Sequence, residues 1–452
     1  MSENYPGLND PDFYKKINKR FKKYEIPDKK PSFKSVCYPE DFKLQPSQLF
    51  LGEYINPKTP YKEILIFHRI GAGKTCTAVN IAEKWKYKRR VIVVVPASLI
   101  GNFRSELRSK CAGDEYLTDK ERNILKNNHP SSNEYQQIIK NSDERINKYY
   151  DIYSYNKFIE LAKEGKLKLE NTILIIDEIQ NMVSEKGTYY ETLLKTIKKA
   201  PKDMRIVLLS ATPMFDKPVE IGLTLNLLRL PFEFPTGKEF NRMFINIKNE
   251  SNDGSGLPKY NVINMDIFKE RIKGYISYYR GAPKHVFPEG RFRYVKCEMS
   301  DFQYRSYLAV LSEDKREQNE DKIYAFKTGD ILNLPSNFLI GARMISNIAF
   351  PNKGIKEEGY KSFTKNQIVG ENLKNYSTKF YSIMAKIKCS KGPVFVYSNF
   401  KEYGGIKSFV KVLEVYGYKN YNTYGEGRKR YAIWSGDEKN SVREEMKAVY
   451  NQ

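Results

Sequence analysis

A short apolar run followed by a glycine-rich turn constrains this chain more than any other stretch. Residues 61–85 read YKEILIFHRIGAGKTCTAVNIAEKW. The apolar run at 64–67 predicts a buried strand, and apolar residues three or four positions apart after the turn predict a helix that ends near Trp85. A strand, a tight turn and a helix N-terminus together form a phosphate cradle, because the free N–H groups and the positive helix end attract anions.

The residue types in this turn suit the phosphates of a nucleotide. The pattern G-x-x-x-x-G-K-[ST] is met except at its first position, where His68 replaces glycine. His68 is either a nucleotide contact or a packed loop residue, and packing is the expected role. Lys74 would place a charge on the phosphates, and the Thr75 hydroxyl would ligate Mg²⁺. The predicted nucleotide contacts here are Gly71, Ala72, Gly73, Lys74, Thr75 and Cys76.

The composition indicates the class of protein and of partner. With 40% apolar residues, 452 residues are enough for about three domains with sizeable cores. Lys and Arg number 77 against 54 Asp and Glu, a net charge of +23. That balance favours a polyanionic partner, nucleic acid before membrane, although a generally basic surface of a Lys-rich chain remains the alternative.

Cysteine usage and hydropathy bear on the compartment. Five scattered cysteines without a CxxC pair, and only three histidines, argue against a zinc site or a disulfide framework and fit a reducing compartment. The amino-terminal segment has no signal-peptide core, and no apolar run approaches the roughly 18 residues of a membrane span. We therefore expect a soluble intracellular protein without a membrane partner.

Beyond the phosphate turn, apolar strands and amphipathic helices alternate. Strands are predicted at 91–95, 151–155, 172–176 and 205–209, and helices at 42–54, 99–107, 156–164 and 189–199. Residues 112–150 read as a polar surface excursion. This alternation predicts an α/β fold with a doubly wound, mostly parallel sheet, whose ligands lie at the carboxyl ends of the strands.

An acidic pair follows one of these strands directly. Asp177 would hold Mg²⁺ and Glu178 would polarise the attacking water. Acidic pairs are also common as solvated loop ends, but a pair at a strand end, after a phosphate turn, favours the functional interpretation.

Four motifs, in order along the chain, resemble those of superfamily 2 helicases. HRIGAGKT, VVPASL, DEIQ and SATP resemble motifs I, Ia, II and III. FHRIGAGKTCTAV, ISYYRGA, ARMISNIAFP and VYSNF are similar to the transcription-associated ATPases of large DNA viruses. That group includes the poxvirus early transcription factor small subunit and nucleoside triphosphate phosphohydrolase I, with mimivirus-type relatives. The resemblance covers about residues 41–452.

The resemblance implies ATP and Mg²⁺ as cofactors and a role for further residues. Gln48 would contact the adenine base, and Gln180 would join Lys74, Asp177 and Glu178 in catalysis by linking the nucleotide site to the other lobe. The segment Ser210, Ala211 and Thr212 would couple nucleotide state to nucleic acid. Backbone contacts to nucleic acid would come from Pro96, Ala97, Ser98, Ser154, Tyr155, Ser398, Asn399 and Phe400. For Ser154, Tyr155 and the last three residues, strand-end packing is the open alternative.

The sequence also departs from the family. It contains no motif V and no Q-x-x-G-R-x-x-R motif VI, whose arginines stabilise charge on the γ-phosphate. We therefore expect either an amino-terminal portion of a longer protein or a shortened paralogue. Because such arginines are worth about 10³ to 10⁵ in the rate of related phosphoryl transfers, this chain alone should bind ATP but hydrolyse it poorly.

The expected organisation has four parts. These are a basic extension at 1–40, either an arm or a packing element, a RecA-like ATP-binding lobe at 41–232, an inserted and mainly helical region at 233–375, and an incomplete second RecA-like lobe at 376–452. A strand at 394–397 and a helix at 405–416 would begin that second lobe. Residues 276–280 either pack within the inserted region or stack on bases, and packing is expected.

The predicted function is a nucleic-acid-dependent ATPase serving viral transcription or DNA remodelling. Its expected partners are a DNA or RNA backbone and a viral RNA polymerase or transcription factor subunit, and its expected location is the virion or the host cytoplasm. One alternative is a non-catalytic, nucleotide-gated subunit that binds DNA or polymerase. Another is an unrelated phosphate-loop enzyme.

Overall fold

The computed structural model describes most of the chain. The described residues are 5–26, 42–130, 132–184, 187–215, 217–248, 259–281, 289–316, 339–354, 356–438 and 440–451. The chain forms two compact units: unit 1 comprises Met1–Asn249 and Lys259–Gly290, and unit 2 comprises Glu250–Pro258 and Arg291–Gln452. The predicted loop at 249–258 and most of the predicted charged tract at 312–330 lie outside the described residues.

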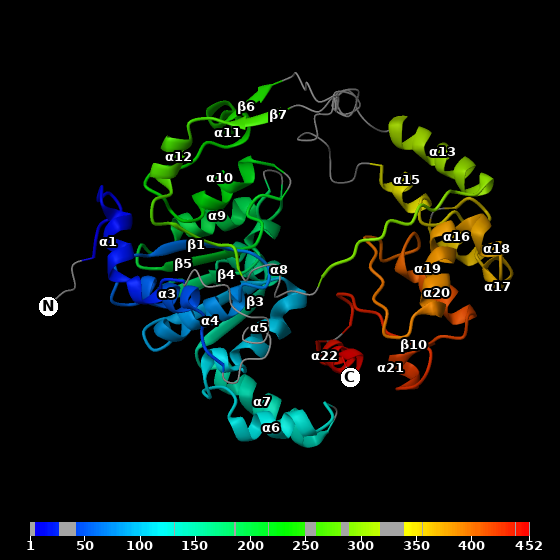
Figure 1. Ribbon diagram of the computed structural model, residues 1–452, viewed down its shortest axis with the longest axis horizontal. Helices are drawn as coiled ribbons and strands as arrows, with labels where there is room; N and C mark the ends of the chain where they lie inside the picture. Colours follow the sequence, from blue (N-terminus) through cyan, green and yellow to red (C-terminus); the bar gives the residue numbers. More distant parts are fainter. Residues whose placement is uncertain are drawn as a thin grey trace. The chain divides into compact units, whose positions relative to one another are not determined.

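A six-stranded parallel sheet, of which β1, β3, β4 and β5 are labelled in Figure 1, is the centre of unit 1. Its strand order is β3-β2-β4-β5-β1-β8. Its strands are β1 (Glu63–His68), β2 (Arg90–Val95), β3 (Tyr150–Ser154), β4 (Thr172–Ile176), β5 (Arg205–Ser210) and β8 (Ile276–Tyr279). The central strands are almost continuous runs of Ile, Leu and Val because both faces of the sheet are buried. The predicted α/β fold is confirmed.

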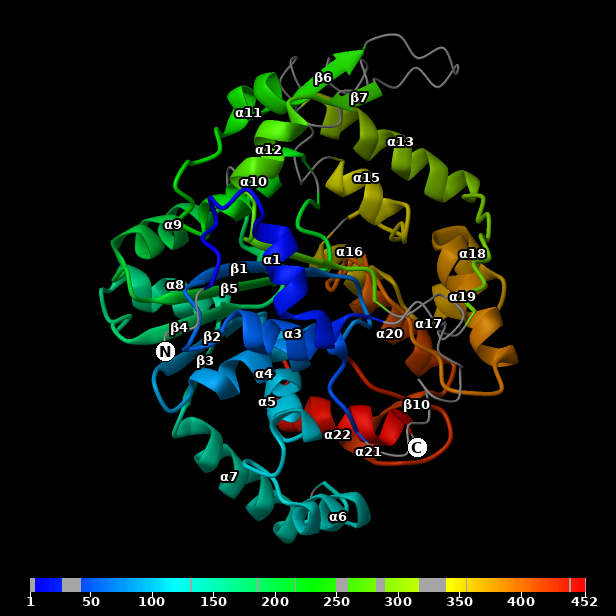
Figure 2. The same cartoon turned by 60° about the vertical axis from the view of Figure 1, so that its left-hand side comes forward.

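Helices cover both faces of this sheet (Figure 2). One face packs against α1 (Phe13–Arg20), α3 (Pro46–Tyr54), α4 (Lys74–Trp85) and α5 (Ile100–Leu107). The other packs against α8 (Tyr155–Lys163), α9 (Tyr190–Lys199), α10 (Val219–Asn226) and α11 (Gly237–Phe244). Successive side chains of β1 alternate between the two cores, with Ile64 and Ile66 in the first and Leu65 in the second.

The polar segment at 112–150 folds into two helices at the surface. They are α6 (Asp119–Asn127) and α7 (Asn133–Asn147), which lie beyond the sheet in both Figure 1 and Figure 2. Thr118 accepts from the backbone N–H of Glu121, and Ser132 from that of Tyr135, so each helix begins at a side-chain cap. A short 3₁₀ turn, η3 (Lys110–Ala112), connects α5 to this pair.

The strand β8 was not expected in the sheet. Residues 276–280 were predicted to pack within the inserted region, but β8 pairs in parallel with β1 and Phe67 lies opposite Tyr278. The preceding Gly274 has a φ of 80°, and its carbonyl accepts a hydrogen bond from Tyr54 Oη at 2.8 Å. This contact returns the chain to the core of unit 1, so the predicted boundaries at 233 and 376 do not coincide with the two compact units.

In the described part of the segment between α11 and β8, Ile245, Phe268 and Ile272 pack against the second core of the sheet. The segment holds an antiparallel pair, β6 (Ile245–Lys248) with β7 (Lys259–Val262), and the helix α12 (Met265–Arg271). At the other end of unit 1, α1 buries Phe13 and Ile17, and the 3₁₀ turn η1 (Lys22–Tyr24) follows it. The described part of the basic extension is therefore a packing element, while residues 27–40 lie outside the described range.

Unit 2 is built mainly from helices. They are α13 (Asp301–Arg316), α15 (Ile340–Ile345), α16 (Glu357–Ser362), α17 (Lys365–Ile368), α18 (Asn372–Tyr376), α19 (Thr378–Cys389), α20 (Ile406–Val415), α21 (Tyr421–Tyr424) and α22 (Asn440–Asn451). The strands β9 (Lys419–Asn420) and β10 (Arg430–Tyr431) form a short parallel pair. Phe350, Phe363, Phe380 and Phe409 are prominent in its buried core.

The predicted strand at 394–397 is wrong. These residues form no strand and pair with no neighbouring strand in the described part of the chain, and the side chains of Phe395 and Tyr397 are 73% and 76% exposed. An apolar run becomes a stable strand only when partners satisfy its backbone groups, and the described part of unit 2 offers none. The helix predicted next, at 405–416, is confirmed as α20.

Two further predictions concern the pairing of the cysteines and the presence of a membrane-spanning helix. The cysteine pattern argued against a disulfide framework, but the structure contains a disulfide between Cys76 in α4 and Cys111 in η3. A separation of 35 positions hides the pairing from any spacing rule, and the packing of η3 against α4 brings their Cα atoms to 5.6 Å. Among the residues that the structure describes, no helix is long and apolar enough to cross a membrane.

Candidate active site

The turn between β1 and α4 has the geometry of an anion site. Gly71 and Gly73 have φ angles of 78° and 71°, which residues with a side chain rarely adopt. No side chain caps α4, so the N–H groups of its first turn, from Lys74 onwards, are left without intrahelical partners. This open helix end fits the phosphates of a nucleotide, as the sequence predicts.

The side chain of Gln48 supports this turn from α3. Its Nε2 donates to the carbonyl of Gly73 at 3.1 Å, and its Oε1 accepts from the backbone N–H of Gln45 at 2.8 Å. Asn80 Nδ2 in α4 donates to the Gln48 carbonyl at 2.8 Å. The contact between Gln48 and adenine stays a prediction, whereas its support of the phosphate turn is directly visible. Asn80 carried no signal in the sequence.

The acidic pair lies at the carboxyl end of β4, beside the phosphate turn. Asp177 is buried, and the N–H of Glu178 donates to its Oδ1 at 3.0 Å. Burial raises the pKa of Asp177 to about 6, the Glu178 charge adds to this rise, and Lys74 opposes it. Lys74 Nζ lies 3.7 Å from Glu178 Oε1. A buried carboxylate short of positive charge suits a divalent cation such as Mg²⁺, which would restore its ionisation.

Glu178 also has an unusual backbone. Its φ and ψ are both 50°, in the left-handed region, where a side chain other than glycine costs free energy. The Tyr155 hydroxyl stabilises this bend by donating to the carbonyl of Asp177 at 2.6 Å and reaching that of Glu178 at 2.9 Å. Tyr155 is buried and its hydroxyl braces the acidic loop, in line with the alternative of strand-end packing, and its contact with nucleic acid stays a prediction.

A chain of hydrogen bonds leads from the acidic pair to the SATP segment. Gln180, in the 3₁₀ turn η4 (Ile179–Asn181), donates through Nε2 to Glu178 Oε2 at 2.7 Å. Its Oε1 accepts from the Ser210 hydroxyl at 2.7 Å. The N–H of Thr212 in turn donates to Ser210 Oγ at 3.0 Å. We call these four residues the coupling chain; it joins the predicted catalytic and coupling residues, with Ala211 contributing only backbone.

His68 is a packed residue, and it ends β1 where a loop was expected. Its side chain is fully buried, with Nε2 lying 3.1 Å from Ser277 Oγ of β8. Burial and the nearby Lys74 charge lower the pKa of His68 to about 4. The imidazole is therefore neutral at physiological pH and adds no positive charge to the phosphate turn.

The structure leaves the remaining predicted nucleic-acid contacts untested. Ala97 and Ser98 are exposed at the carboxyl end of β2, in the turn η2 (Ala97–Leu99), and Pro96 precedes them half-buried. Ser154 caps α8 by accepting from the N–H of Lys157. In unit 2, Ser398 bonds locally with the backbone of Phe400, and Asn399 accepts from the Tyr397 hydroxyl.

Comparison with known proteins identifies the family. The profile of the SNF2-related domain matches residues 58–344, well over half of the chain. The chain belongs to the SNF2-related family. The match contains the phosphate turn, the acidic pair and the coupling chain, and it rules out the alternative of an unrelated phosphate-loop enzyme.

Relatives of this SNF2-related chain come from large DNA viruses. A protein of Acanthamoeba polyphaga mimivirus, named as a candidate ATP-dependent RNA helicase, is 53% identical over 447 residues, which is 99% of this chain and 76% of the relative. A second such mimivirus protein is 28% identical, with 95% of this chain matching 45% of it. The termination factor NPH-I homolog of African swine fever virus is 26% identical over 374 residues, 79% of this chain and 49% of the relative. The predicted resemblance to viral helicase-like ATPases is confirmed.

Proposed function

We propose that this SNF2-related chain hydrolyses ATP in response to nucleic acid, in the transcription or DNA remodelling of a large DNA virus. It would act in the virion or the host cytoplasm, beside a viral RNA polymerase or transcription factor subunit. Family membership supports ATP hydrolysis as the reaction, and the named termination factor among its relatives supports transcription as the process.

The coupling chain is the observation that carries this proposal. It connects Glu178, which lies 3.7 Å from Lys74, to Thr212, which is exposed at the carboxyl end of β5. When a nucleotide draws Lys74 towards its phosphates, Glu178 loses its positive neighbour and its hydrogen bond with Gln180 must readjust. That change reaches the buried Ser210 and then the exposed Thr212 through two further hydrogen bonds. A site built only to hold a nucleotide has no use for such a connection.

The side chains have separate tasks in this proposal. Lys74 neutralises phosphate charge, Thr75 and Asp177 would hold Mg²⁺, and Glu178 orients the attacking water. Magnesium would supply charge that stabilises the transferred phosphoryl group. The Tyr155 hydroxyl keeps the acidic loop in its left-handed bend, so that both carboxylates face the phosphate turn.

We further propose that the chain as given turns ATP over slowly. No Q-x-x-G-R-x-x-R segment occurs in its 452 residues. Arginines at that motif contribute about 10³ to 10⁵ in rate in comparable phosphoryl transfers. A nucleotide-gated subunit that binds DNA or polymerase without turnover is the extreme form of this behaviour and the competing proposal.

Steady-state ATP hydrolysis tests the proposal, measured with and without single- and double-stranded DNA or RNA. We expect nucleic acid to raise the turnover of the wild-type chain. Glu178→Gln should retain ATP binding but lose at least about 10²-fold in turnover, since its general base is gone. Ser210→Ala breaks the middle of the coupling chain, so it should keep basal turnover and lose the stimulation.

Ser132→Ala is the matched serine control. It removes only the cap of α7, and it should respond to nucleic acid like the wild type. Stimulation that survives in Ser210→Ala would contradict the role of the coupling chain. ATP binding without turnover under every condition would favour the non-catalytic subunit.

A further inference from the structure

The disulfide of unit 1 is attached to the candidate active site itself. Cys76 follows Thr75 in the first turn of α4, where the free N–H groups of the phosphate cradle lie. Its sulfur is bonded to Cys111, so its backbone N–H is the group left for the predicted nucleotide contact. Both cysteines are buried. Any movement at the bridge is therefore transmitted to the residue beside Thr75.

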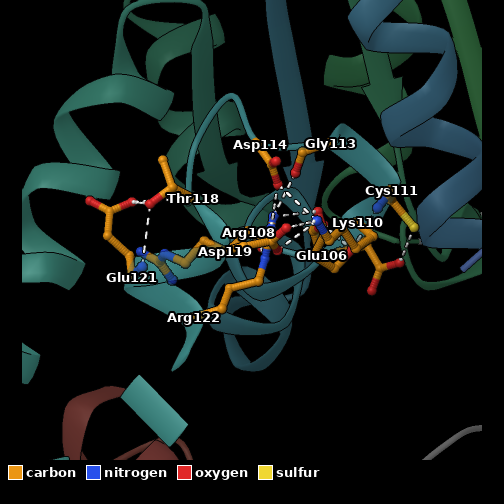
Figure 3. A network of polar contacts seen from close by, with 11 residues as sticks. Glu106, Arg108, Lys110, Cys111, Gly113, Asp114, Thr118, Asp119, Glu121 and Arg122 are labelled. Carbon is orange, nitrogen blue, oxygen red and sulfur yellow. Dashed lines mark hydrogen bonds and ion pairs between the residues drawn. The ribbon is translucent and has the colours of Figure 1, made fainter. Parts of the chain in front are cut away.

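The other end of the bridge is firmly held. Cys111 lies in η3, where its N–H donates to Ser109 Oγ at 3.1 Å. The next contacts come from charged side chains, with Lys110 Nζ paired to Asp119 at 2.6 Å and Arg122 bonded to the carbonyl of Gly113 (Figure 3). A closed bridge therefore ties the first turn of α4 to a braced element between α5 and α6.

A carboxylate beside the bridge can accept a proton from a cysteine only when the bridge is open. Glu106 Oε1 lies 2.9 Å from the Cys111 sulfur, at the contact drawn in Figure 3. A disulfide sulfur has no proton to donate, whereas a thiol at this position would donate one to Glu106. Burial raises the pKa of Glu106, which makes this carboxylate a stronger base for a neighbouring thiol.

We propose that Cys76 and Cys111 form a thiol–disulfide exchange site, and that closing the bridge strengthens nucleotide binding at the phosphate turn. The oxidant is a low-molecular-weight disulfide. After Glu106 takes its proton, the Cys111 thiolate attacks one sulfur of that disulfide and releases one thiolate. That thiolate takes the proton back from Glu106, and the regenerated carboxylate accepts the proton of Cys76. The Cys76 thiolate then attacks the Cys111 sulfur and releases the second small thiolate, which Glu106 protonates in turn. Two protein thiols lose two protons and two electrons, and the small disulfide becomes two thiols.

The direction of the effect follows from the fold. With the bridge closed, the phosphate turn already has its two left-handed glycines and its open helix end. With the bridge open, the uncapped first turn of α4 loses a covalent link to η3, so ordering it becomes part of the cost of binding. We expect the closed form to bind nucleotide at least about fivefold more tightly, at the low end of usual coupling between sites.

This inference rests on the proposed nucleotide site, so the experiment measures the bridge and nucleotide binding separately. The full chain is either oxidised with glutathione disulfide or reduced with dithiothreitol, in buffers with a metal chelator until Mg²⁺ is added. The chelator matters because the Cys76, Glu106 and Cys111 ligand atoms lie within 4.8 Å of one another and could hold an adventitious metal. Peptide mapping reports the bridge, and titration with a non-hydrolysable fluorescent ATP analogue reports affinity.

The expected result is a Cys76–Cys111 peptide in the oxidised chain and a loss of affinity of at least about fivefold on reduction. Cys111→Ser should bind as weakly as the reduced wild type in both conditions. Cys297→Ser is the matched control, since Cys297 is a free cysteine of unit 2, and it should respond like the wild type. Glu106→Gln should reach the same oxidised state more slowly, with a changed pH dependence of the closing rate.

Several outcomes would overturn the inference. They are absence of the bridge after oxidation, equal affinities of the two forms, and tighter binding by the reduced chain. Because the wild-type comparison uses one folded protein in two states, it holds even if Cys111→Ser fails to fold, which circular dichroism would reveal. Lack of nucleotide binding in both states would instead refute the proposed function first.

Discussion

Gly73 holds the most constrained backbone position of the candidate site. Its φ of 71° lies in the left-handed region, and a β-carbon added to it would meet Gln48 Nε2 at 2.5 Å. The absent side chain therefore leaves room for the hydrogen bond from Gln48 to the Gly73 carbonyl. A single atom would disturb both the turn and the side chain that supports it.

We predict that Gly73→Ala weakens ATP binding by about tenfold or more, which corresponds to roughly 1.4 kcal/mol. Equilibrium titration with an ATP analogue measures this. Gly165→Ala is the control, because Gly165 also has a positive φ, of 66°, but nothing lies within 4 Å of its added β-carbon. It should lose about 1–2 kcal/mol of stability and keep its nucleotide affinity. Equal losses of affinity in both variants would contradict the role given to Gln48.

Asp177 makes nucleotide binding sensitive to pH. Its pKa is raised to about 6, so the carboxyl group becomes neutral as the pH falls through that value. In the absence of metal, the charged form costs stability above about pH 6, and this cost disappears as the group is protonated. Bound Mg²⁺ favours the charged form and would shift this transition to lower pH.

We therefore expect the gain in ATP affinity from Mg²⁺ to shrink as the pH falls from about 7.5 to about 5. Affinity titrations at several pH values, each with and without Mg²⁺, provide the measurement. Asp177→Asn should show little Mg²⁺ effect at any pH, and its metal-free form should melt at a higher temperature than the wild type near neutral pH. A constant Mg²⁺ effect in the wild type would mean that another group holds the metal.

For individual residues of the candidate site, the sequence predicts those that belong to a motif. It misses those whose role depends on tertiary contacts. Lys74, Asp177 and Glu178 lie together because they follow the carboxyl ends of β1 and β4, which meet at the same edge of a parallel sheet. The part played by Tyr155 depends on a bond to carbonyls 22 and 23 positions away, which no local pattern encodes. The same is true of the Cys76–Cys111 bridge, which only the packing of η3 on α4 creates.

Among the elements, α1 shows how a basic helix can still be part of a core. Its sequence FYKKINKR carries four positive charges, yet Phe13 is 1% exposed and its neighbour Tyr14 is 56% exposed. Phe13 packs against Tyr61 with their ring centroids 6.0 Å apart. The basic residues occupy the outer side of the helix, so charge alone does not reveal a free arm.

We predict that Phe13→Ala destabilises unit 1 by about 3–5 kcal/mol, the usual cost of removing a buried phenyl ring. Tyr14→Ala, one position along the same helix, should change stability by no more than about 0.5 kcal/mol. Urea denaturation followed by tryptophan fluorescence measures this in a Trp434→Phe background, where the remaining Trp85 lies in the core of unit 1. Similar effects of the two substitutions would indicate that α1 is not held as the structure describes.

The elements of unit 1 were easier to predict than those of unit 2 for a physical reason. The strand predicted at 172–176 matches β4 at both ends, because a strand buried on both faces is an unbroken apolar run. The run at 394–397 has the same local character but no pairing neighbour in the described residues, so it forms no strand and most of its side chains are exposed. Local pattern reports the tendency to form a strand, whereas pairing depends on the rest of the sheet.

Over the whole molecule, the excess of 23 positive charges bears on the proposed nucleic-acid partner. Binding that depends on phosphate contacts releases counterions, so its affinity falls linearly on a double-logarithmic plot against salt. We expect DNA of arbitrary sequence to bind at least about tenfold more weakly at about 200 mM than at about 50 mM salt. Fluorescence anisotropy with two unrelated sequences measures the slope. A DNA affinity that does not change with salt concentration would indicate that the basic residues are exposed to solvent without contacting phosphates.

The position of β8 in the sheet affects how the protein folds during its synthesis. The contact between His68 and Ser277 joins residues 209 positions apart, and β8 is the neighbour of the strand that leads into the phosphate turn. During synthesis, β1 would therefore remain an open edge until the ribosome has released residues up to about 280, long after the other strands have emerged. Such distant pairing slows folding and leaves apolar strand surface available for aggregation. A chain that ended before β8 would contain every predicted catalytic residue but would lack the edge strand that pairs with β1.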